Sequence, residues 1–240
     1  MEAFIVNAFS EVLGGGNPAG VVILSLADPP LEAAFMQAIA KDVGKSETAF
    51  VSPGESSFAY RIRWYSPTRE MPLCGHATLA AASILFETAA SHSLSFGYAA
   101  GTINVVREED GLIFMRFPLD RFDRIPAPGE QCGFFDLAGA EDCLLGRSTK
   151  KLVLVLDAGI DLEAIRPDFH AMRTFLGPGS EGICLTKPSG RADFESRYFN
   201  PWAGVDEDPV TGSVHTLLAR YWSTRLGKDR LHAWQASQRP

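Results

Sequence analysis

The feature that most constrains the fold is an apolar run of eleven residues that begins at His76 and ends at Phe86. After the histidine it contains no charge and no polar residue larger than threonine. A helix that is apolar on every side is buried, and a run of this length is too short to cross a bilayer. We therefore expect a helix that runs through the middle of a domain and is surrounded by strands.

The start of this helix, Cys74-Gly75-His76, is a candidate anion-binding position. The first-turn amides of a helix lack intrahelical partners and can bind a negatively charged group. Gly75 has no side chain that would keep a ligand away from this backbone.

The same pattern recurs in the second half of the chain. The segment from Tyr60 to Glu87 resembles the segment from Phe194 to Trp222, and TAFVSP at Thr48–Pro53 resembles ICLTKP at Ile183–Pro188. A long-period repeat of this kind predicts two similar domains, each with one buried helix. We place them at residues 1–122 and 123–240, because the chain from Arg121 is richer in proline, glycine and charge.

In the second copy, Thr211-Gly212-Ser213 takes the place of Cys74-Gly75-His76. If the two domains face each other, we expect both helix starts to meet at one inter-domain cleft.

Composition excludes several classes of partner. The net charge is −7 and the pI is about 5.3, so no basic surface for nucleic acid is expected. We expect no membrane association, because no polybasic helix is present. The four cysteines form no C-x-x-C pair, and the N-terminus lacks the pattern of a signal peptide, which indicates reduced thiols in a cytoplasmic protein.

Local patterns predict the remaining elements. The expected strands are Ala3–Phe9, Gly20–Leu26, Phe58–Tyr65, Leu94–Phe96, Thr102–Val106, Leu112–Phe117, Lys151–Leu156 and Leu231–Ala236. The expected helices are Leu31–Val43, ended by Gly44, and Pro167–Leu176, and the expected turns include Gly14–Pro18 and Gly177–Gly182.

Several motifs in register resemble the phenazine-biosynthesis PhzF-like family across essentially the whole chain. The motifs are Gly16-Asn17-Pro18, Ser46–Phe50, Ser66–Thr68, Pro72–Thr78 and Asp208–Ser213. The resemblance implies an α+β fold similar to diaminopimelate epimerase, in which two similar domains each wrap a β-barrel around a central helix. It also implies a cofactor-independent isomerase, without a metal, that forms a homodimer and acts on a small carboxylate-bearing substrate.

The namesake of the family isomerises 2,3-dihydro-3-hydroxyanthranilate by moving a proton between ring carbons. By resemblance, Glu47 would be the acid/base that takes and returns the proton, and His76 and Asp208 would assist. Substrate binding would fall to the remaining motif residues, which are Asn17, Cys74, Gly75, Gly212 and Ser213. This chemistry needs a base that takes a proton from a substrate carbon, and fixed hydrogen-bond donors that stabilise the anion as it develops.

Each of these residues also has a structural interpretation. Asp208 before Pro209 would favour the start of the second helix, and Ser213 would be its N-cap. His76 would be a satisfied polar residue at a helix start, and Cys74 a small apolar filler.

Two departures from the family pattern leave alternatives open. Cysteine-based epimerases of this fold carry a thiol before the glycine in both halves, whereas this chain has Cys74 and Thr211. A Cys74-dependent dehydratase or epimerase therefore remains an alternative, as does a non-catalytic small-molecule binding protein. The chain also ends where relatives continue, so we expect the second barrel to lack its last strands.

Overall fold

The computed structural model describes residues 1–10, 15–175 and 181–237. Contacts within the chain divide it into two compact units, Met1–Phe117 (unit 1) and Pro118–Pro240 (unit 2). The sequence analysis places this division between residues 122 and 123. The expected turns at Gly14–Pro18 and Gly177–Gly182 lie partly outside the described residues.

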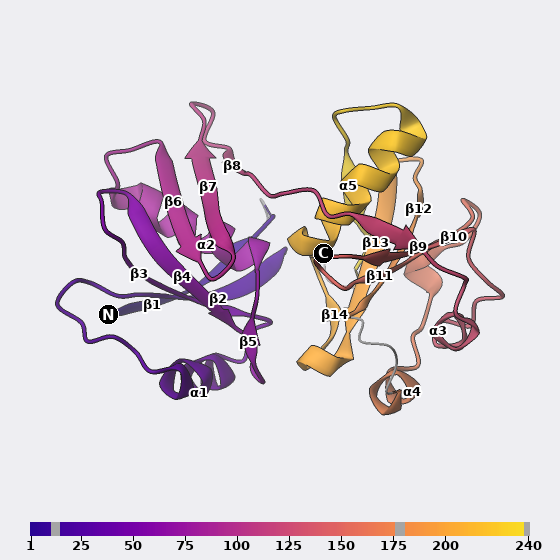
Figure 1. Ribbon diagram of the computed structural model, residues 1–240, viewed down its shortest axis with the longest axis horizontal. Helices are drawn as coiled ribbons and strands as arrows, with labels where there is room; N and C mark the ends of the chain where they lie inside the picture. The colour runs from indigo at the N-terminus through magenta and orange to yellow at the C-terminus, as the bar shows by residue number, and fades with distance from the viewer. Residues whose placement is uncertain (11–14, 176–180, 238–240) are drawn as a thin grey trace. The chain divides into compact units, whose positions relative to one another are not determined.

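Unit 1 is an eight-stranded sheet that curls around helix α2 (Gly75–Thr88), as Figure 1 shows. The strand order is β1-β2-β3-β4-β6-β7-β8, and the short strand β5 pairs with β4. The strands are β1 (Glu2–Ala8), β2 (Asn17–Ile23), β3 (Thr48–Pro53), β4 (Ala59–Tyr65), β5 (Glu70–Met71), β6 (Ser93–Tyr98), β7 (Gly101–Arg107) and β8 (Ile113–Met115).

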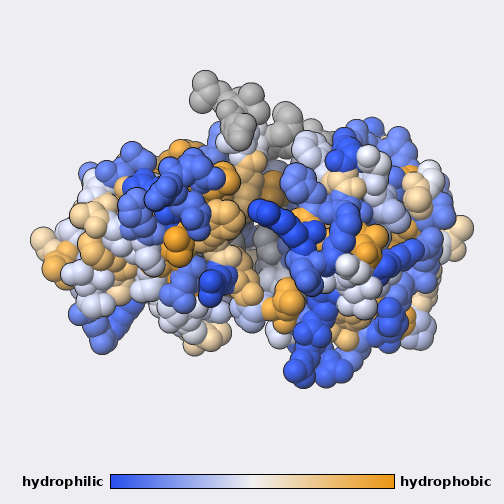
Figure 2. Space-filling view, turned by 90° about the horizontal axis from the view of Figure 1, so that it is seen from above, coloured by the Kyte–Doolittle hydropathy of each residue, from blue (hydrophilic) through white to orange (hydrophobic). Residues whose placement is uncertain are grey.

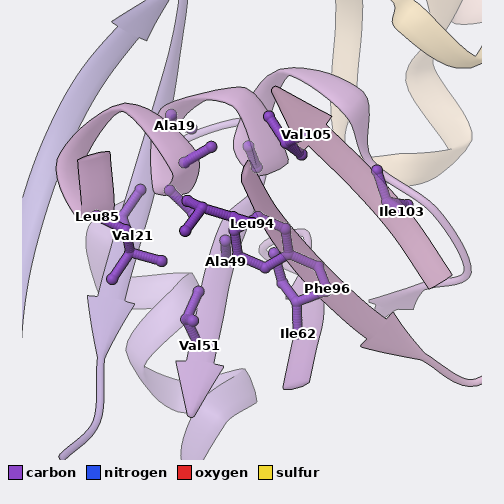
Figure 3. Packing of buried hydrophobic residues seen from close by; sticks show 14 of the residues in the cluster. Ala19, Val21, Ala49, Val51, Ile62, Leu85, Leu94, Phe96, Ile103 and Val105 are labelled. Carbon is purple, nitrogen blue, oxygen red and sulfur yellow. The ribbon is translucent and has the colours of Figure 1, made fainter. Parts of the chain in front are cut away.

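Side chains of these strands alternate between two hydrophobic clusters, as the pleat of a strand requires. Ala49 and Val51 of β3 belong to the cluster around α2, which Figure 3 shows. Phe50, between them, belongs to the cluster with Met36 and Ala40 of helix α1 (Ala33–Val43). The sheet of unit 1 is therefore covered on one face by α2 and on the other by α1.

Unit 2 repeats this plan around helix α5 (Gly212–Leu226). Its seven-stranded sheet has the order β14-β13-β12-β11-β10-β9, with β15 paired to β13. The strands are β9 (Phe122–Arg124), β10 (Asp142–Gly146), β11 (Leu152–Val155), β12 (Ile183–Pro188), β13 (Phe194–Asn200), β14 (Val205–Asp208) and β15 (Ala233–Gln235). The short helices are α3 (Gly129–Gly133), α4 (Phe169–Thr174), η1 (Leu162–Ala164) and η2 (Pro201–Ala203).

The strand register confirms the repeat that the sequence predicts. β3 pairs antiparallel with β4 so that Thr48 lies opposite Tyr65, and β12 pairs antiparallel with β13 so that Ile183 lies opposite Phe199. In both units the preceding strand runs parallel to the first member of this pair, β2 to β3 and β11 to β12. The two halves therefore share the pairing of these three strands as well as a sequence pattern.

The repeat extends to side-chain contacts, because the second strand of each pair carries an arginine that binds a glutamate in the same way. The Arg63 guanidinium donates to both oxygens of Glu70 at 2.7 and 2.8 Å, and Arg197 does the same to Glu207 at 2.7 and 2.8 Å. The two pairs differ in burial: the Arg63 side chain is 43% exposed, whereas that of Arg197 is 1% exposed. The same contact is therefore a surface ion pair in unit 1 and a buried one in unit 2.

The expected turn at Gly14–Pro18 is wrong for its last two residues, because β2 begins at Asn17. Pro18 lies opposite Asn7 of β1, and pairing with β3 begins only at Gly20. Proline has no backbone N–H to donate to a neighbouring strand. It is tolerated here because it lies at the start of β2, where only one side of the strand is paired.

Other predicted elements are confirmed with shorter bounds. The helix expected to begin at Leu31 begins at Ala33, and Gly44 ends it with a left-handed φ of 62°. The strand expected at Leu231–Ala236 is β15, Ala233–Gln235.

The face of the molecule seen in Figure 2 mixes hydrophilic and hydrophobic residues on both units. Within the described ranges, none of the helices combines the length and apolarity needed to span a membrane.

Candidate functional site

Glu47 lies immediately before β3, on the link that follows α1. Its carbonyl accepts a 3.0 Å hydrogen bond from the amide of Gly20 in β2, which fixes the backbone of Glu47 to the sheet. A Cβ on Gly20 would lie 2.6 Å from the hydroxyl of Thr48, so only glycine allows this close approach.

The start of α2 is anchored to the sheet by a chain of hydrogen bonds. The Trp64 indole on β4 donates to the Thr78 hydroxyl at 3.1 Å, and this hydroxyl donates to the carbonyl of Cys74 at 2.6 Å. Cys74 is the N-cap residue of α2, and Gly75 and His76 are its first two residues. The helix therefore places a thiol, two backbone amides and an imidazole at one point of unit 1.

Three functional groups converge at this point. The Nε2 atom of His76 lies 3.5 Å from Oε2 of Glu47, and its Nδ1 atom lies 3.4 Å from Sγ of Cys74. One ligating atom from each residue lies within 4.8 Å of the others. Cys74 and His76 are buried, and the side chain of Glu47 is 15% exposed. We call these three residues the Glu47 cluster.

Ser46 determines which nitrogen of His76 carries the proton. The Ser46 hydroxyl donates its hydrogen to Oδ1 of Asn17 at 3.1 Å, and it lies 3.2 Å from Nε2 of His76. Because a hydroxyl has one hydrogen, the His76 contact is made by Nε2–H donating to the Ser46 oxygen. Nδ1 is then an acceptor, and the thiol of Cys74 is placed to donate to it.

Burial lowers the pKa of His76 to about 3. Transfer of an imidazolium out of water disfavours its charged form. His76 is therefore neutral across the physiological pH range, and it carries no positive charge beside the carboxylate of Glu47.

In unit 2, the start of α5 is organised by Thr211, its N-cap residue. The Thr211 hydroxyl donates to Oδ2 of Asp208 at 2.5 Å. Gln235 on β15 accepts from the Thr211 amide at 2.9 Å and donates to the Asp208 carbonyl at 2.6 Å. Asp208 is therefore held by the N-cap residue of α5 and by a strand that follows the helix in the sequence.

Gly212 and Ser213 are the first two residues of α5, and both are partly buried. The expectation that Ser213 is the N-cap is wrong, because Thr211 occupies that position. His215 lies one turn into the helix, with Nδ1 2.8 Å from the Thr211 carbonyl, and burial lowers its pKa. It contacts the backbone of its own helix and the ring of Phe194, which are packing contacts.

The structure brings together five of the residues predicted from sequence in unit 1. They are Asn17, Glu47, Cys74, Gly75 and His76. In unit 2 it groups the other three, which are Asp208, Gly212 and Ser213. Sequence reasoning missed Ser46 and Gln235 as parts of these groups. Ser46 was within a recognised motif, whereas nothing in the sequence around Gln235 indicates its contact with the start of α5.

Comparison with known proteins decides the family. A family model described as "Phenazine biosynthesis-like protein" matches residues 6–240. The chain belongs to the PhzC–PhzF family. This PhzF-family chain is 41% identical over 241 residues to a protein of Pseudomonas aeruginosa named as an uncharacterized isomerase, and the match covers 100% of this chain and 88% of that protein.

Solved structures agree with this assignment. A crystal structure of a phenazine biosynthesis protein of the PhzF family from Enterococcus faecalis is 37% identical, with a TM-score of 0.85 over 98% of this chain and 86% of that one. A hydroxyproline epimerase from Agrobacterium vitis is 12% identical, with a TM-score of 0.58 over 92% of this chain and 77% of that one. The second likeness shows that this PhzF-family chain shares the epimerase-like fold.

Proposed function

We propose that this chain is an isomerase that moves a proton within a small carboxylate-bearing metabolite, with Glu47 as its acid/base. The observation that carries the proposal is the carboxylate of Glu47, 3.5 Å from the neutral imidazole of His76 and next to the start of a buried helix. Relatives in the family that are named as isomerases support the reaction class.

The reaction needs only groups that the chain supplies. The C–H bond of the substrate breaks, its proton forms an O–H bond on Glu47, and the electron pair moves into the conjugated system of the substrate. Glu47 then returns the proton to a second carbon, so no oxidant or reductant is consumed. A positioned base within hydrogen-bond reach of the proton is the first requirement of such a step.

The developing anion needs fixed donors, and the first-turn amides of α2 provide them. These amides are available because the side chain of the N-cap residue Cys74 makes no capping hydrogen bond. Preorganised donors of this kind stabilise the negative charge that forms as the proton leaves.

The same amides fit a carboxylate on the substrate. A helix N-terminus combines unpaired N–H groups with the positive end of the helix dipole, and Gly75 adds no side chain over them. In unit 2, we assign substrate positioning to Gly212 and Ser213 by the same reasoning, because they begin α5. Asp208, beside them, would position a polar group of the substrate that can donate a hydrogen bond.

The test is incorporation of deuterium from D2O into a panel of unsaturated and cyclic amino acids and carboxylic acids, followed by NMR. We expect label to enter one panel member with the wild-type chain, and incorporation to fall at least about 100-fold with Glu47→Gln. Glu55→Gln is the matched control, because the Glu55 side chain is 90% exposed on the same unit. Equal incorporation by wild type and Glu47→Gln would refute the role of Glu47.

The thiol of Cys74 favours a second candidate function, a Cys74-dependent dehydratase or epimerase. The sulfur lies 3.4 Å from Nδ1 of His76, at the start of the buried helix α2. Under this alternative Cys74→Ala abolishes the reaction, whereas under our proposal it leaves most of the activity. A folded chain that binds a panel member but exchanges no proton would indicate a binding protein.

A further inference from the structure

We propose that Cys74, His76 and Glu47 bind a thiophilic divalent cation of the Zn²⁺ class. Among the residues that the structure describes, this is the one group of three or more His, Cys, Asp or Glu side chains whose ligating atoms converge, all within 4.8 Å. The cation would compete with proton transfer by Glu47. That consequence depends on the proposed function, whereas the binding itself does not.

The spacing of the sulfur and the imidazole nitrogen fits one ion. With Zn–S near 2.3 Å and Zn–N near 2.0–2.1 Å, a tetrahedral angle places the two ligand atoms about 3.6 Å apart. Sγ of Cys74 and Nδ1 of His76 lie 3.4 Å apart. An ion can therefore bridge these two atoms with almost no movement of the start of α2.

The third ligand has to move slightly. Oε2 of Glu47 lies 3.5 Å from Nε2, on the other nitrogen of the ring, and the ion would use Nδ1. The ligand atoms of the three residues lie within 4.8 Å of one another, against the separation of about 3.6 Å that a tetrahedral ion requires, so a shift of about 1 Å by the carboxylate completes the site. Three protein ligands leave a fourth tetrahedral position for water or for an oxygen of a bound molecule.

The surroundings of His76 match those of a metal-binding histidine. Such a histidine normally donates its second N–H to a neighbouring acceptor, which holds the ring and the tautomer. Here Nε2–H donates to the Ser46 oxygen, and Ser46 in turn donates to Asn17. The lone pair of Nδ1 consequently points toward Cys74, where the ion would bind.

The donor set decides the class of ion. A thiolate, an imidazole and a carboxylate favour Zn²⁺ and its softer analogue Cd²⁺ over Mg²⁺ or Ca²⁺, which prefer oxygen ligands only. Binding would release the proton of the Cys74 thiol to solvent, and the thiolate and the carboxylate together would balance the charge of the ion.

Cd²⁺ titration of the purified chain, without substrate, tests the proposal through the ultraviolet charge-transfer band of a thiolate–cadmium bond. We expect one equivalent to produce the band in the wild type and Zn²⁺ to displace it. Cys74→Ser should abolish the band, whereas Cys143→Ala, which removes a buried thiol of unit 2, should leave it unchanged. Glu47→Gln should retain the band but weaken Cd²⁺ binding at least about 10-fold.

Circular dichroism of each variant confirms that it is folded. A wild-type chain without the band, a folded Cys74→Ser variant with the same band, or a Glu47→Gln variant that binds as tightly as the wild type would each overturn the proposal. Because no substrate is present, the result is independent of whether the chain catalyses proton transfer.

Discussion

Neutral, buried His76 should make the stability of unit 1 depend on pH in a defined way. The pKa of His76 is about 3 in the folded chain, against an ordinary value of 6.5. Between these values the unfolded chain binds a proton that the folded chain does not. Stability therefore falls as pH decreases through 6.5 and continues to fall toward pH 3.

The size of the effect follows from the two pKa values. Integration of proton binding from pH 6.0 to pH 4.5 gives a loss of about 1.9 kcal/mol in the free energy of unfolding. Over the whole interval between the two pKa values the ceiling is about 5 kcal/mol, at 1.36 kcal/mol per pH unit. His76→Gln lacks this titration, so its stability should fall by about 1.9 kcal/mol less over the same pH range.

The assay is urea denaturation of the wild type and His76→Gln at several pH values from 4.5 to 7. His76→Gln also loses the contacts with Ser46 and Cys74, which shifts its stability at every pH but does not restore the slope. Parallel slopes for the two proteins would refute the neutral state of His76. An NMR titration of the wild type checks the same point directly, and an imidazole that titrates above pH 5 would contradict the structure.

Three further predictions concern the other contacts described above. Glu207→Gln leaves the buried guanidinium of Arg197 without its carboxylate and should lower the free energy of unfolding, measured by urea denaturation, by about 3 kcal/mol. The equivalent Glu70→Gln on the surface of unit 1 should lower it by less than about 1 kcal/mol. Equal losses for the two variants would refute the difference in burial. Gln235→Ala removes the acceptor of the Thr211 amide, so this amide should exchange its hydrogen with solvent faster. The free energy of unfolding should fall by about 1–2 kcal/mol. An unchanged exchange rate of the Thr211 amide would contradict the contact. Saturating Zn²⁺ should stop deuterium incorporation into the substrate, and full activity with the ion bound would show that it leaves the acid/base unhindered.

Much of the fold was predictable because its strongest signals are local. The apolar run from His76 to Phe86 predicts a buried helix, and α2 is such a helix. The match of Thr48–Pro53 with Ile183–Pro188 predicts equivalent strands, and both pair with equivalent partners.

Short elements that depend on distant partners were not predictable. Strand β9, Phe122–Arg124, has three residues and is defined by its pairing with β10. Asn17 and Pro18 have the composition of a turn, yet β1 pairs with them. In both cases tertiary pairing overrides local preference.

The candidate site likewise contains residues that the sequence identifies and residues whose roles depend on distant contacts. Glu47, Cys74 and His76 lie in recognisable motifs, so sequence alone identifies them. The role of Ser46 depends on His76, which lies thirty residues away in the sequence. The role of Gln235 depends on the start of α5, twenty-four residues earlier. A single sequence shows neither of these contacts.

The central helices of the two units differ in the size of their buried side chains, so the helix of one unit cannot replace that of the other. α2 turns alanines toward its sheet, and Ala77, Ala80, Ala81 and Ala82 are at most 1% exposed. At the positions of α5 that correspond to Ala77, Ala80 and Ala81, the buried side chains are Val214, Leu217 and Leu218. A chimera that transplants α5 into unit 1 would overfill the space that alanines define, although its strands would keep their register. The duplicated halves have therefore become distinct parts, each matched to its own helix and not interchangeable with the other.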